Sequence, residues 1–220
     1  MKQLIIICEG QTEQSFCQEV IAPYLYNKCN IQSFAPVIAT SGGGIVKWEK
    51  LKKEINSYLY RENKNTFVTT FIDYYGLHQN LNYPQNRKTE NVAERRTIVS
   101  QIEQAMQYEI EEHIRYRFIP YIQLHEFESL IFSKVEVLGE WFAPNEIKER
   151  DYIYQTIKEQ PDPELINDGI NTAPSKRLQK AIPTYDKVTY GTILTSDIGL
   201  DYLRKQCTNF NNWITKLENI

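Results

Sequence analysis

The chain has 220 residues, of which 41% are hydrophobic and 24% charged, so its composition excludes a fibrous or largely disordered protein. This length supports one sizeable hydrophobic core. Lys and Arg number 25 against 28 Asp and Glu, and the net charge of -3 excludes a generally basic surface, so a nucleic acid would have to bind a local patch.

The cysteines and the hydropathy pattern predict the compartment. Cys8, Cys17, Cys29 and Cys207 include no Cys-x-x-Cys pair, which favours free thiols over a disulfide framework or a zinc site. No stretch approaches the ~20 apolar residues of a membrane span, and the apolar run at the start of the chain is too short for a secretory signal. We therefore expect a cytoplasmic protein that does not bind membranes.

The first segments of the chain predict a buried strand followed by a helix. Gln3–Cys8 is a continuous run rich in β-branched residues, as is typical of a strand that is buried on both faces. Apolar residues at helical spacing between positions 16 and 25 predict a helix. Thr12 is the expected N-cap of this helix, and Pro23 is expected to kink or end it.

The next segments repeat the alternation of strand and helix. Phe34–Thr40 predicts a second strand, and Trp48–Leu59 predicts an amphipathic helix. Thr66–Ile72 predicts a third strand that ends at Asp73. The glycine-rich residues 41–44 fit a flexible turn better than an anion-binding nest, because no Gly-Lys-Ser/Thr of a phosphate loop follows them.

A long loop separates the third strand from the rest of the predicted sheet. Residues 74–91 show no period and contain Gly, Pro and several Asn, which is typical of a functional loop. Val92–Ile114 predicts a helix, and Phe118–Leu124 predicts a fourth strand in which Pro120 is best placed at an edge or a bulge. A final helix is expected over 210–217. The buried face of the 92–114 helix is predicted to consist of Val99, Ile102, Met106 and Ile110.

This order of elements predicts an α/β fold. Repeated strand-helix-strand units favour a mostly parallel four-stranded sheet with helices on both faces. The second half of the chain reads as a helical C-terminal extension. We expect residues 1–132 to form the α/β domain and residues 133–220 to pack on the same domain as that extension.

Acidic residues follow three of the four predicted strands. Glu9 comes directly after the first strand, Asp73 closes the third, and Glu126 and Glu128 follow the fourth. Ligands of open parallel sheets bind beyond the carboxyl ends of the strands, so these side chains are expected to converge. Converging carboxylates favour a hard divalent cation, Mg²⁺ or Mn²⁺. The alternative is that single acids cap helices or lie in first helical turns.

The placement of two of these acids in the sequence resembles that of the metal-binding acids of the Toprim fold. In Toprim proteins a glutamate after the first strand joins an Asp-x-Asp after a later strand to hold Mg²⁺ for phosphodiester chemistry. The turn Cys8-Glu9-Gly10 resembles the glutamate turn, and Asp73 occupies the position of the first aspartate. Tyr75 replaces the second aspartate, and this departure removes one acid from the usual set.

A closer resemblance covers nearly the whole chain. It is carried by four runs, which are Glu9-Gly10-x-Thr12-Glu13, Asp73-Tyr74-Tyr75-Gly76-Leu77, His125-Glu126-Phe127-Glu128-Ser129-Leu130-Ile131-Phe132 and Pro174-Ser175-Lys176-Arg177-Leu178. These runs resemble a bacterial Toprim-like domain-of-unknown-function family, catalogue number 4276. Within that family the Asp-Tyr-Tyr pattern is usual, which makes Glu126 and Glu128 the candidates to replace the missing acid.

The resemblance also implies a partner and a context. Genes of this family often lie beside those of AAA-type ATPases in defence-related neighbourhoods. This association implies the nuclease subunit of an anti-phage system, similar to the nucleases of the overcoming-lysogenization-defect type.

Basic residues and one histidine are candidates to assist such chemistry. Lys176 and Arg177 are predicted to clamp a substrate phosphate as a point charge and a planar fork, respectively. The alternative is that both belong to the solvated first turn of a helix after Pro174. His125 is a candidate general base or water-positioning residue, and the alternative is a structural, hydrogen-bonded histidine.

Together these observations lead to a divalent-metal-dependent phosphodiesterase that acts on nucleic acid. Glu9 and Asp73, with Glu126 or Glu128, would hold the ion, and Lys176 or Arg177 would stabilise charge that develops on the phosphate. The alternative is a non-catalytic Toprim-like interaction module that partners an ATPase. A third hypothesis, a nucleotide-binding or primase-like protein, is disfavoured by the absence of a phosphate-loop motif.

Overall fold

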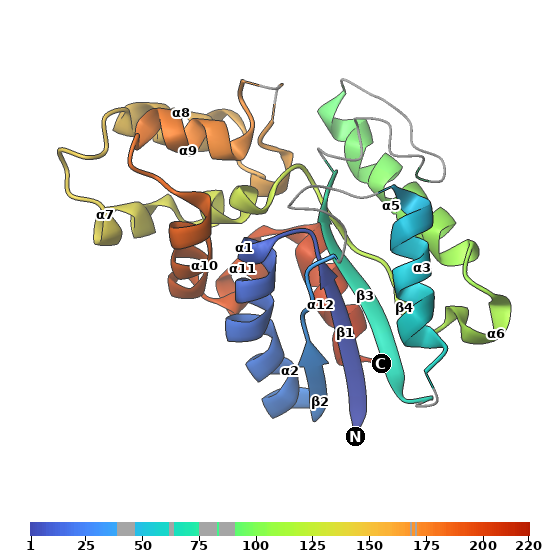
Figure 1. Cartoon of the computed structure of the whole chain (residues 1–220). Helices are drawn as coiled ribbons and strands as arrows, with labels where there is room; N and C mark the ends of the chain where they lie inside the picture. The colour runs from blue at the N-terminus through green and yellow to red at the C-terminus, as the bar shows by residue number, and fades with distance from the viewer. Residues whose placement is uncertain (39–46, 62–63, 75–82, 84–90, 168, 170) are drawn as a thin grey trace.

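The computed structural model describes residues 1–38, 47–61, 64–74, 83, 91–167, 169 and 171–220. Within these ranges a parallel sheet has the order β2-β1-β3-β4, and β5 pairs with β3 beyond β4 (Figure 1). The predicted α/β class with a mostly parallel sheet is therefore confirmed. The strands are β1 (Lys2–Cys8), β2 (Ile31–Phe34), β3 (Thr66–Asp73), β4 (Phe118–Ile119) and β5 (Ile122–Gln123).

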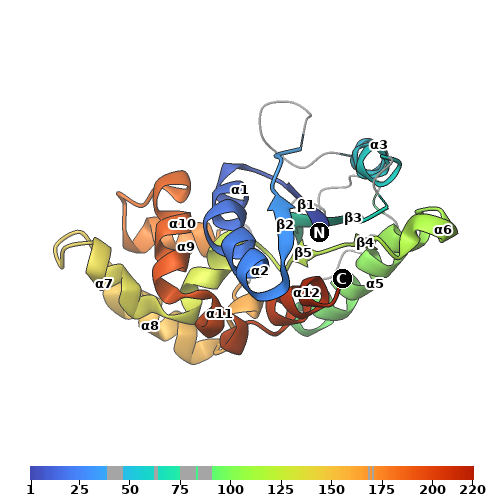
Figure 2. The same cartoon turned by 90° about the horizontal axis from the view of Figure 1, so that it is seen from below.

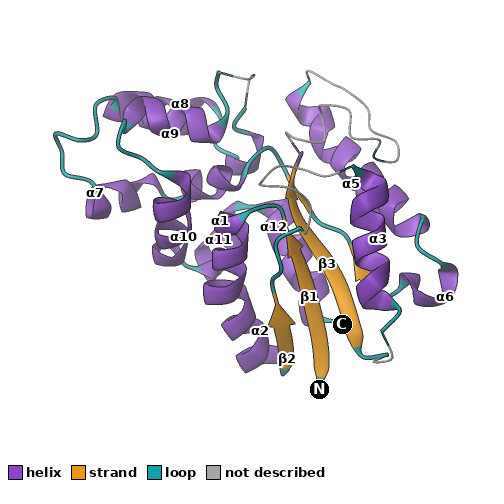
Figure 3. Cartoon of the chain, viewed as in Figure 1, coloured by secondary structure: helices purple, strands orange, loops and turns teal. Residues whose placement is uncertain are grey.

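Helices flank the sheet and make up most of the second half of the chain (Figure 3). The first half contains α1 (Gln11–Phe16), α2 (Ala22–Cys29), α3 (Trp48–Leu59), α5 (Val92–Tyr108) and α6 (Glu112–Arg115). The second half contains α7 (Leu138–Trp141), α8 (Arg150–Glu159), α9 (Pro174–Ala181), α10 (Lys187–Ile198), α11 (Leu200–Gln206) and α12 (Thr208–Glu218). Shorter helical segments are the π-helix Cys17–Ile21 and the 3₁₀ helices Phe127–Ser133, Val135–Val137 and Pro163–Leu165. None of the described helices is both long and apolar enough to cross a membrane.

The sheet is buried on both faces, as the β-branched first strand predicts. Alternate residues of a strand point to opposite faces, so Leu4 and Ile6 join one hydrophobic cluster while Ile5 and Ile7 join the other. The first cluster packs β1 and β3 against α1, α2 and the C-terminal helices, and the second packs them against α3 and α5. Accordingly, α3 lies on the opposite side of the sheet from α2 and α12 (Figure 2).

The second strand was predicted at the wrong position. The structure has β2 at Ile31–Phe34 in place of the predicted Phe34–Thr40, and only an isolated bridge between Val37 and Cys8 continues the pairing. Pro36 has no N–H to donate to a ladder, and its carbonyl oxygen instead accepts from the Cys8 N–H at 2.9 Å. Residues 39–46, which include the glycine-rich turn, lie outside the described residues.

The first helix begins and bends differently from the prediction. Gly10, not Thr12, is its N-cap, and the Glu13 side chain accepts a hydrogen bond from the Gly10 N–H at 3.0 Å. The π-helix Cys17–Ile21 separates α1 from α2, and Pro23 lies in the first turn of α2, where its missing N–H costs no helical hydrogen bond. Helical dihedral angles continue through Ile21 and Ala22 into α2, so Pro23 does not end the helix, and a π-helical segment lies directly before it.

The region from α5 to β5 also departs from the prediction at two points. The helix predicted over 92–114 ends at Tyr108, and a separate α6 follows. The predicted fourth strand is interrupted after Ile119, and the Thr70 hydroxyl fills the gap by donating to the Tyr121 carbonyl and accepting from its N–H. Pro120 therefore lies at an interruption of the sheet-edge strand, as expected. The predicted buried face of the helix is confirmed for Val99, Ile102, Met106 and Ile110.

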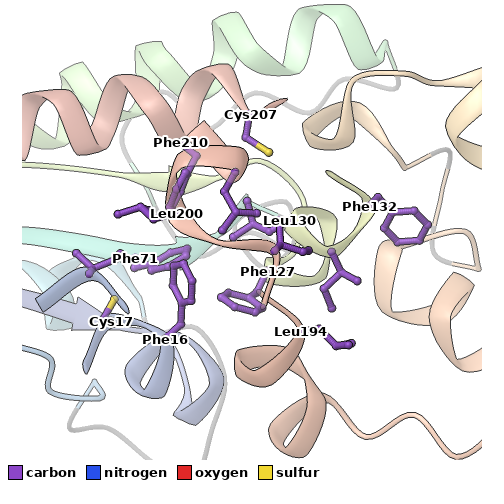
Figure 4. Close-up of a cluster of buried hydrophobic side chains, with 14 of the residues drawn as sticks. Phe16, Cys17, Phe71, Phe127, Leu130, Phe132, Leu194, Leu200, Cys207 and Phe210 are labelled. Atoms are coloured by element: carbon purple, nitrogen blue, oxygen red, sulfur yellow. The ribbon is translucent and has the colours of Figure 1, made fainter. Parts of the chain in front are cut away.

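The C-terminal helices share one hydrophobic core with the sheet. Phe71 of β3 packs between Phe127 and Trp213, with ring centroids 5.9 and 5.1 Å away, and Phe16 of α1 lies 5.4 Å from Phe127 (Figure 4). The fully buried Glu164 accepts hydrogen bonds from backbone N–H groups in the first turn of α12, where the helix dipole favours a carboxylate. The predicted final helix corresponds to α12.

The four cysteines are free in the structure. Cys8, Cys17 and Cys207 are buried and Cys29 is half-buried. This agrees with the predicted absence of a disulfide framework. The three buried thiols behave as small hydrophobic residues of the core.

Close contact between α1 and α10 makes Gly191 sensitive to substitution. A Cβ at this position would lie 2.6 Å from Thr12 Cγ2 and 3.4 Å from Phe127 Cε1. We expect Gly191→Ala to lower the free energy of unfolding by about 1–2 kcal/mol, measured in urea, because overpacking outweighs the gain in helix propensity. Gly139→Ala on α7 is the control, since its nearest neighbour is 3.8 Å away, and it should lower stability little or not at all. Equal losses in both variants would contradict this prediction.

Candidate functional site

The carboxyl ends of β1 and β3 bring Glu9 and Asp73 together, at the top of the sheet in Figure 1. Cys8 is paired with Phe71 in a parallel register, and the Glu9 N–H donates to the Phe71 carbonyl oxygen at 3.0 Å. The Glu9 side chain then accepts a hydrogen bond from the Asp73 N–H through Oε2 at 2.8 Å. The expected convergence of these two acids is thus observed.

Glu126 and Glu128 reach the same region from the segment after β5. Glu128 is fully buried in the 3₁₀ helix Phe127–Ser133, and Glu126 precedes this helix. Glu126 Oε2 accepts from the backbone N–H of Ser175 at 2.9 Å, in the first turn of α9. The charge of Glu126 acts on both Glu9 and Glu128. All four predicted acids therefore belong to one electrostatically coupled group.

Two members of the site were missed by the sequence reasoning. Glu13 of α1 is buried beside the predicted acids, and Lys187 is the first residue of α10. The Lys187 ammonium nitrogen lies 3.4 Å from Glu128 Oε2, 3.7 Å from Glu13 Oε1 and 3.9 Å from Asp73 Oδ2. Glu13 follows Glu9 by one helical turn, which is a signal that could have identified it. Nothing in the sequence near Lys187 indicates this contact, because it depends on how α10 packs against α1.

We refer to Glu9, Glu13, Asp73, Glu126 and Glu128 as the carboxylate cluster. The cluster places more negative charge in the interior than its lysine can balance. Burial raises the pKa of Glu9 and of Glu128 to about 7 and raises that of Asp73 well above its usual value, with the neighbouring carboxylates adding to each shift. Burial would lower the pKa of Lys187, but the surrounding carboxylates raise it. Protonation can neutralise part of this charge, and a second cation would compensate the carboxylates that remain ionised.

Several carboxylate oxygens have no hydrogen-bond partner among the described residues. They are Glu13 Oε1, Asp73 Oδ1 and both side-chain oxygens of Glu128, all of them buried. Buried carboxylate oxygens are costly unless they are paired or coordinate a metal. The donor set consists of hard oxygens, which fits Mg²⁺ or Mn²⁺. Among the described residues, however, no three or more acids, histidines or cysteines are arranged so that they could hold a metal ion, so a metal site here would require the side chains of the cluster to move.

Lys176 and Arg177 occupy different environments on α9. The Lys176 side chain is exposed and contacts Gln179 at 3.3 Å. Arg177 is buried and donates to the Thr172 carbonyl oxygen and to the hydroxyls of Tyr152 and Thr156, so it joins α9 to α8. The exposed Lys176 side chain can therefore contact a ligand at the surface. The hydrogen bonds of Arg177 give it a structural role.

His125 lies directly before the acids in a strained conformation. Its φ of 73° is in the left-handed region, which is uncommon for a non-glycine residue. Burial, with a smaller contribution from Arg95, lowers the His125 pKa to about 3, so the imidazole is neutral at physiological pH. The Asn167 amide nitrogen lies 3.3 Å from Nδ1, and Nε2 has no hydrogen-bond partner among the described residues. A pKa this low makes the imidazole a weak proton acceptor, which favours the alternative of a structural, hydrogen-bonded histidine over a general base.

Most of the loop that follows β3 lies outside the described residues. Tyr75, which replaces the second aspartate of the Toprim pattern, lies outside the described residues, as do 76–82 and 84–90. Tyr74 and Tyr83 are described and are buried in the second hydrophobic cluster. These two tyrosines therefore pack on the domain.

The fold and site define an α/β protein whose parallel sheet carries a buried carboxylate cluster at its carboxyl edge. The sequence model of the family described as domain of unknown function DUF4276 matches residues 8–218, and the chain belongs to this family. The match includes all the cluster residues and Lys187. Comparisons with curated proteins and with solved structures find no significant match.

The raised carboxyl pKa values predict how stability depends on pH in a chelator-treated sample. A carboxyl group whose pKa is higher in the folded state binds more protons when folded, so its contribution is present below pH ~4.5 and is lost as the pH rises through about 7. The side chain of the Glu128→Gln variant stays neutral. As the pH rises over this range, we expect the unfolding free energy of this variant to fall by about 1–3 kcal/mol less than that of the wild type. Urea unfolding at several pH values measures the difference. Parallel pH profiles for the two proteins would contradict it.

Proposed function

We propose that the protein is a divalent-metal-dependent phosphodiesterase, a nuclease that acts on nucleic acid with Mg²⁺ or Mn²⁺. The observation that carries this proposal is the carboxylate cluster at the carboxyl edge of the sheet, where Lys187 pairs with three buried acids and two further, half-buried acids lie in the same group. Parallel α/β sheets use this edge for ligands, and a cation would compensate the carboxylates of the cluster that are ionised. Hard-oxygen sites of this kind hold Mg²⁺ together with substrate phosphates.

In this proposal the described residues have separate tasks. Glu9, Asp73, Glu126 and Glu128 would hold the ion, and the ion would supply Lewis acidity for phosphodiester hydrolysis. Hydrogen bonds from backbone N–H groups orient Glu9 and Glu126 for this task.

Basic residues would bind the substrate phosphate. Lys176 is the first candidate, because its side chain is exposed on the first turn of α9, the turn that is bonded to Glu126 through Ser175. Arg177 lies next to it, but most of its known donors are used to join α8 and α9. A phosphate-binding role for Arg177 therefore requires exchange of one of these hydrogen bonds.

The resemblance to Toprim proteins supports the same chemistry. Glu9 lies in a turn after the first strand and Asp73 at the end of a neighbouring strand, which are the places of the Toprim glutamate and first aspartate. Because the second aspartate position is Tyr75, Glu126 and Glu128 complete the acid set in our proposal. An AAA-type ATPase is the proposed partner, and anti-phage defence the proposed context, by association with the family's gene neighbourhoods.

The ion pairs of Lys187 favour a second candidate function. An ammonium that already contacts three of the acids would partly stabilise the cluster without a metal. The second candidate is accordingly a non-catalytic Toprim-like module that binds an ATPase. The two candidates differ in whether the purified protein binds a divalent ion.

Nucleolytic activity provides the direct test. We expect Mn²⁺- or Mg²⁺-dependent cleavage of single- or double-stranded DNA or RNA, assayed with and without the neighbour-encoded ATPase. Asp73→Asn should reduce the rate at least about 100-fold, since loss of a metal-binding charge removes electrostatic stabilisation of the transition state. Asp201→Asn, an exposed acid on α11, is the control and should leave the rate unchanged. Cleavage that survives Asp73→Asn would count against the proposed site.

Metal binding separates the two candidate functions without any assay of activity. A ligand that binds only the folded state raises its stability, so saturating Mn²⁺ should raise the Tm of the wild type. The same addition should raise the Tm of Asp73→Asn much less. No change in the Tm of the wild type, together with no heat of binding in calorimetry, would favour the interaction module.

A further inference from the structure

We propose that a cleft between α5 and α12 binds a nucleotide unit that carries one phosphate, at a place separate from the carboxylate cluster. This inference goes beyond the proposed function, because it assigns a second ligand site and needs no metal ion. Its basis is the set of aromatic, cationic and hydrogen-bonding side chains that line one cavity.

The cleft lies at the edge of the sheet that β4 forms. Its cavity has a volume of about 660 Å³, which is in the range of sites for small molecules and cofactors. The walls come from α5 and α12, which lie side by side (Figure 2), and β3 and the interrupted strand at Pro120 line the space between them. Phe67 lines the cleft and lies six positions before Asp73 in β3. A rise of ~3.3 Å per residue therefore puts the cleft roughly 20 Å from the carboxylate cluster.

The cleft offers an aromatic surface for a base. Tyr116 is 64% exposed, and its ring centroid lies 6.4 Å from that of Phe67 in an edge-to-face arrangement. Both rings line the cavity together with Ile119 and Pro120. Bases of every kind stack on aromatic side chains. A ring that is held by one aromatic neighbour and is otherwise largely exposed is suited to this contact.

Lys216 supplies a cation for one phosphate. This residue of α12 lines the cleft and is exposed, and among the described residues its ammonium takes part in no ion pair and donates no hydrogen bond. Lysine binds phosphate as a point charge. Arg96 lines an adjoining cavity of about 280 Å³, but its guanidinium already pairs with Asp162 and Glu164 at 2.8 and 3.2 Å. The cleft therefore suits one phosphate better than a triphosphate chain.

Glu103 of α5 supplies a carboxyl group for the edge of a base. Its Oε1 accepts from the Ile122 N–H at 2.9 Å, and its Oε2 forms no hydrogen bond within the described part of the chain. Burial raises the pKa of Glu103 to about 7, whereas the Ile122 N–H and Lys216 act to lower it. The carboxyl group can accept from a base when ionised and donate to it when protonated. Its charge beside Lys216 also opposes a longer phosphate chain.

Nucleotide binding without a divalent ion tests this inference. In buffer with a chelator, isothermal titration calorimetry of the full chain should show saturable binding of at least one of AMP, GMP, CMP and UMP, or of single-stranded hexathymidylate. Binding of a monophosphate would identify a free nucleotide as the ligand, and binding of hexathymidylate alone would identify a nucleotide within a strand. No binding of any of these probes would overturn the inference. Tighter binding of the corresponding triphosphate would overturn the assignment of one phosphate.

Matched variants locate the bound nucleotide. Tyr116→Ala should weaken binding about 10-fold through lost stacking, and Lys216→Met should weaken it by about the same factor through the lost charge. Tyr26→Ala on α2 and Lys205→Met on α11 replace exposed residues of the same types away from the cleft and should leave the affinity unchanged. Wild-type affinity in both Tyr116→Ala and Lys216→Met would overturn the inference.

The inference and the proposed function can fail separately. Asp73→Asn, which should abolish cleavage, should bind the nucleotide as the wild type does, because the cleft lies apart from the carboxylate cluster. Loss of nucleotide binding in a folded Asp73→Asn variant would assign the ligand to the cluster and overturn the inference. Nucleotide binding by a protein that shows no metal-dependent cleavage would support the inference and count against the proposed function alone.

Discussion

The arrangement of the whole molecule depends on the balance of charge around the Lys187 ammonium. Glu13, Asp73 and Glu128 come from α1, β3 and a 3₁₀ helix, and each is removed from water beside this one cation. Like charges in a poorly solvated place repel strongly, so a compensating positive charge lowers the cost of packing these three elements together. The contact between α1 and α10, with its glycine at the closest approach, delivers that charge.

The second half of the chain thereby becomes part of the site and not only a cover for the sheet. Strand ends supply Glu9 and Asp73, whereas Glu126, Glu128 and Lys187 come from the segments after β5. A shared core with Phe71 at its centre fixes the strand ends relative to the segments that follow β5. Glu164 holds the start of α12 against the same core. Hydrophobic packing thus determines the distances on which the electrostatics depend.

The sequence was sufficient to predict the parallel α/β fold and the convergence of Glu9 with Asp73, because both follow from β-branched runs and strand ends. It was insufficient where tertiary contacts override local pattern. Pro36 cannot donate a backbone hydrogen bond where the second strand was expected to continue. Beside Pro120, the Thr70 hydroxyl replaces the missing backbone pairing by bonding to Tyr121. Lys187 was missed for the same reason. It lies 114 positions after Asp73 in the sequence, at the start of a helix, and only the packing of that helix brings it to the acids.

The separation of the cluster residues along the chain has a consequence for synthesis on the ribosome. The acids between positions 9 and 128 leave the ribosome before Lys187 does, and until then they lack the cation that allows them to be buried together. The cluster can therefore be completed only after most of the polypeptide has emerged. Until then the acids of a nascent chain remain apart and hydrated.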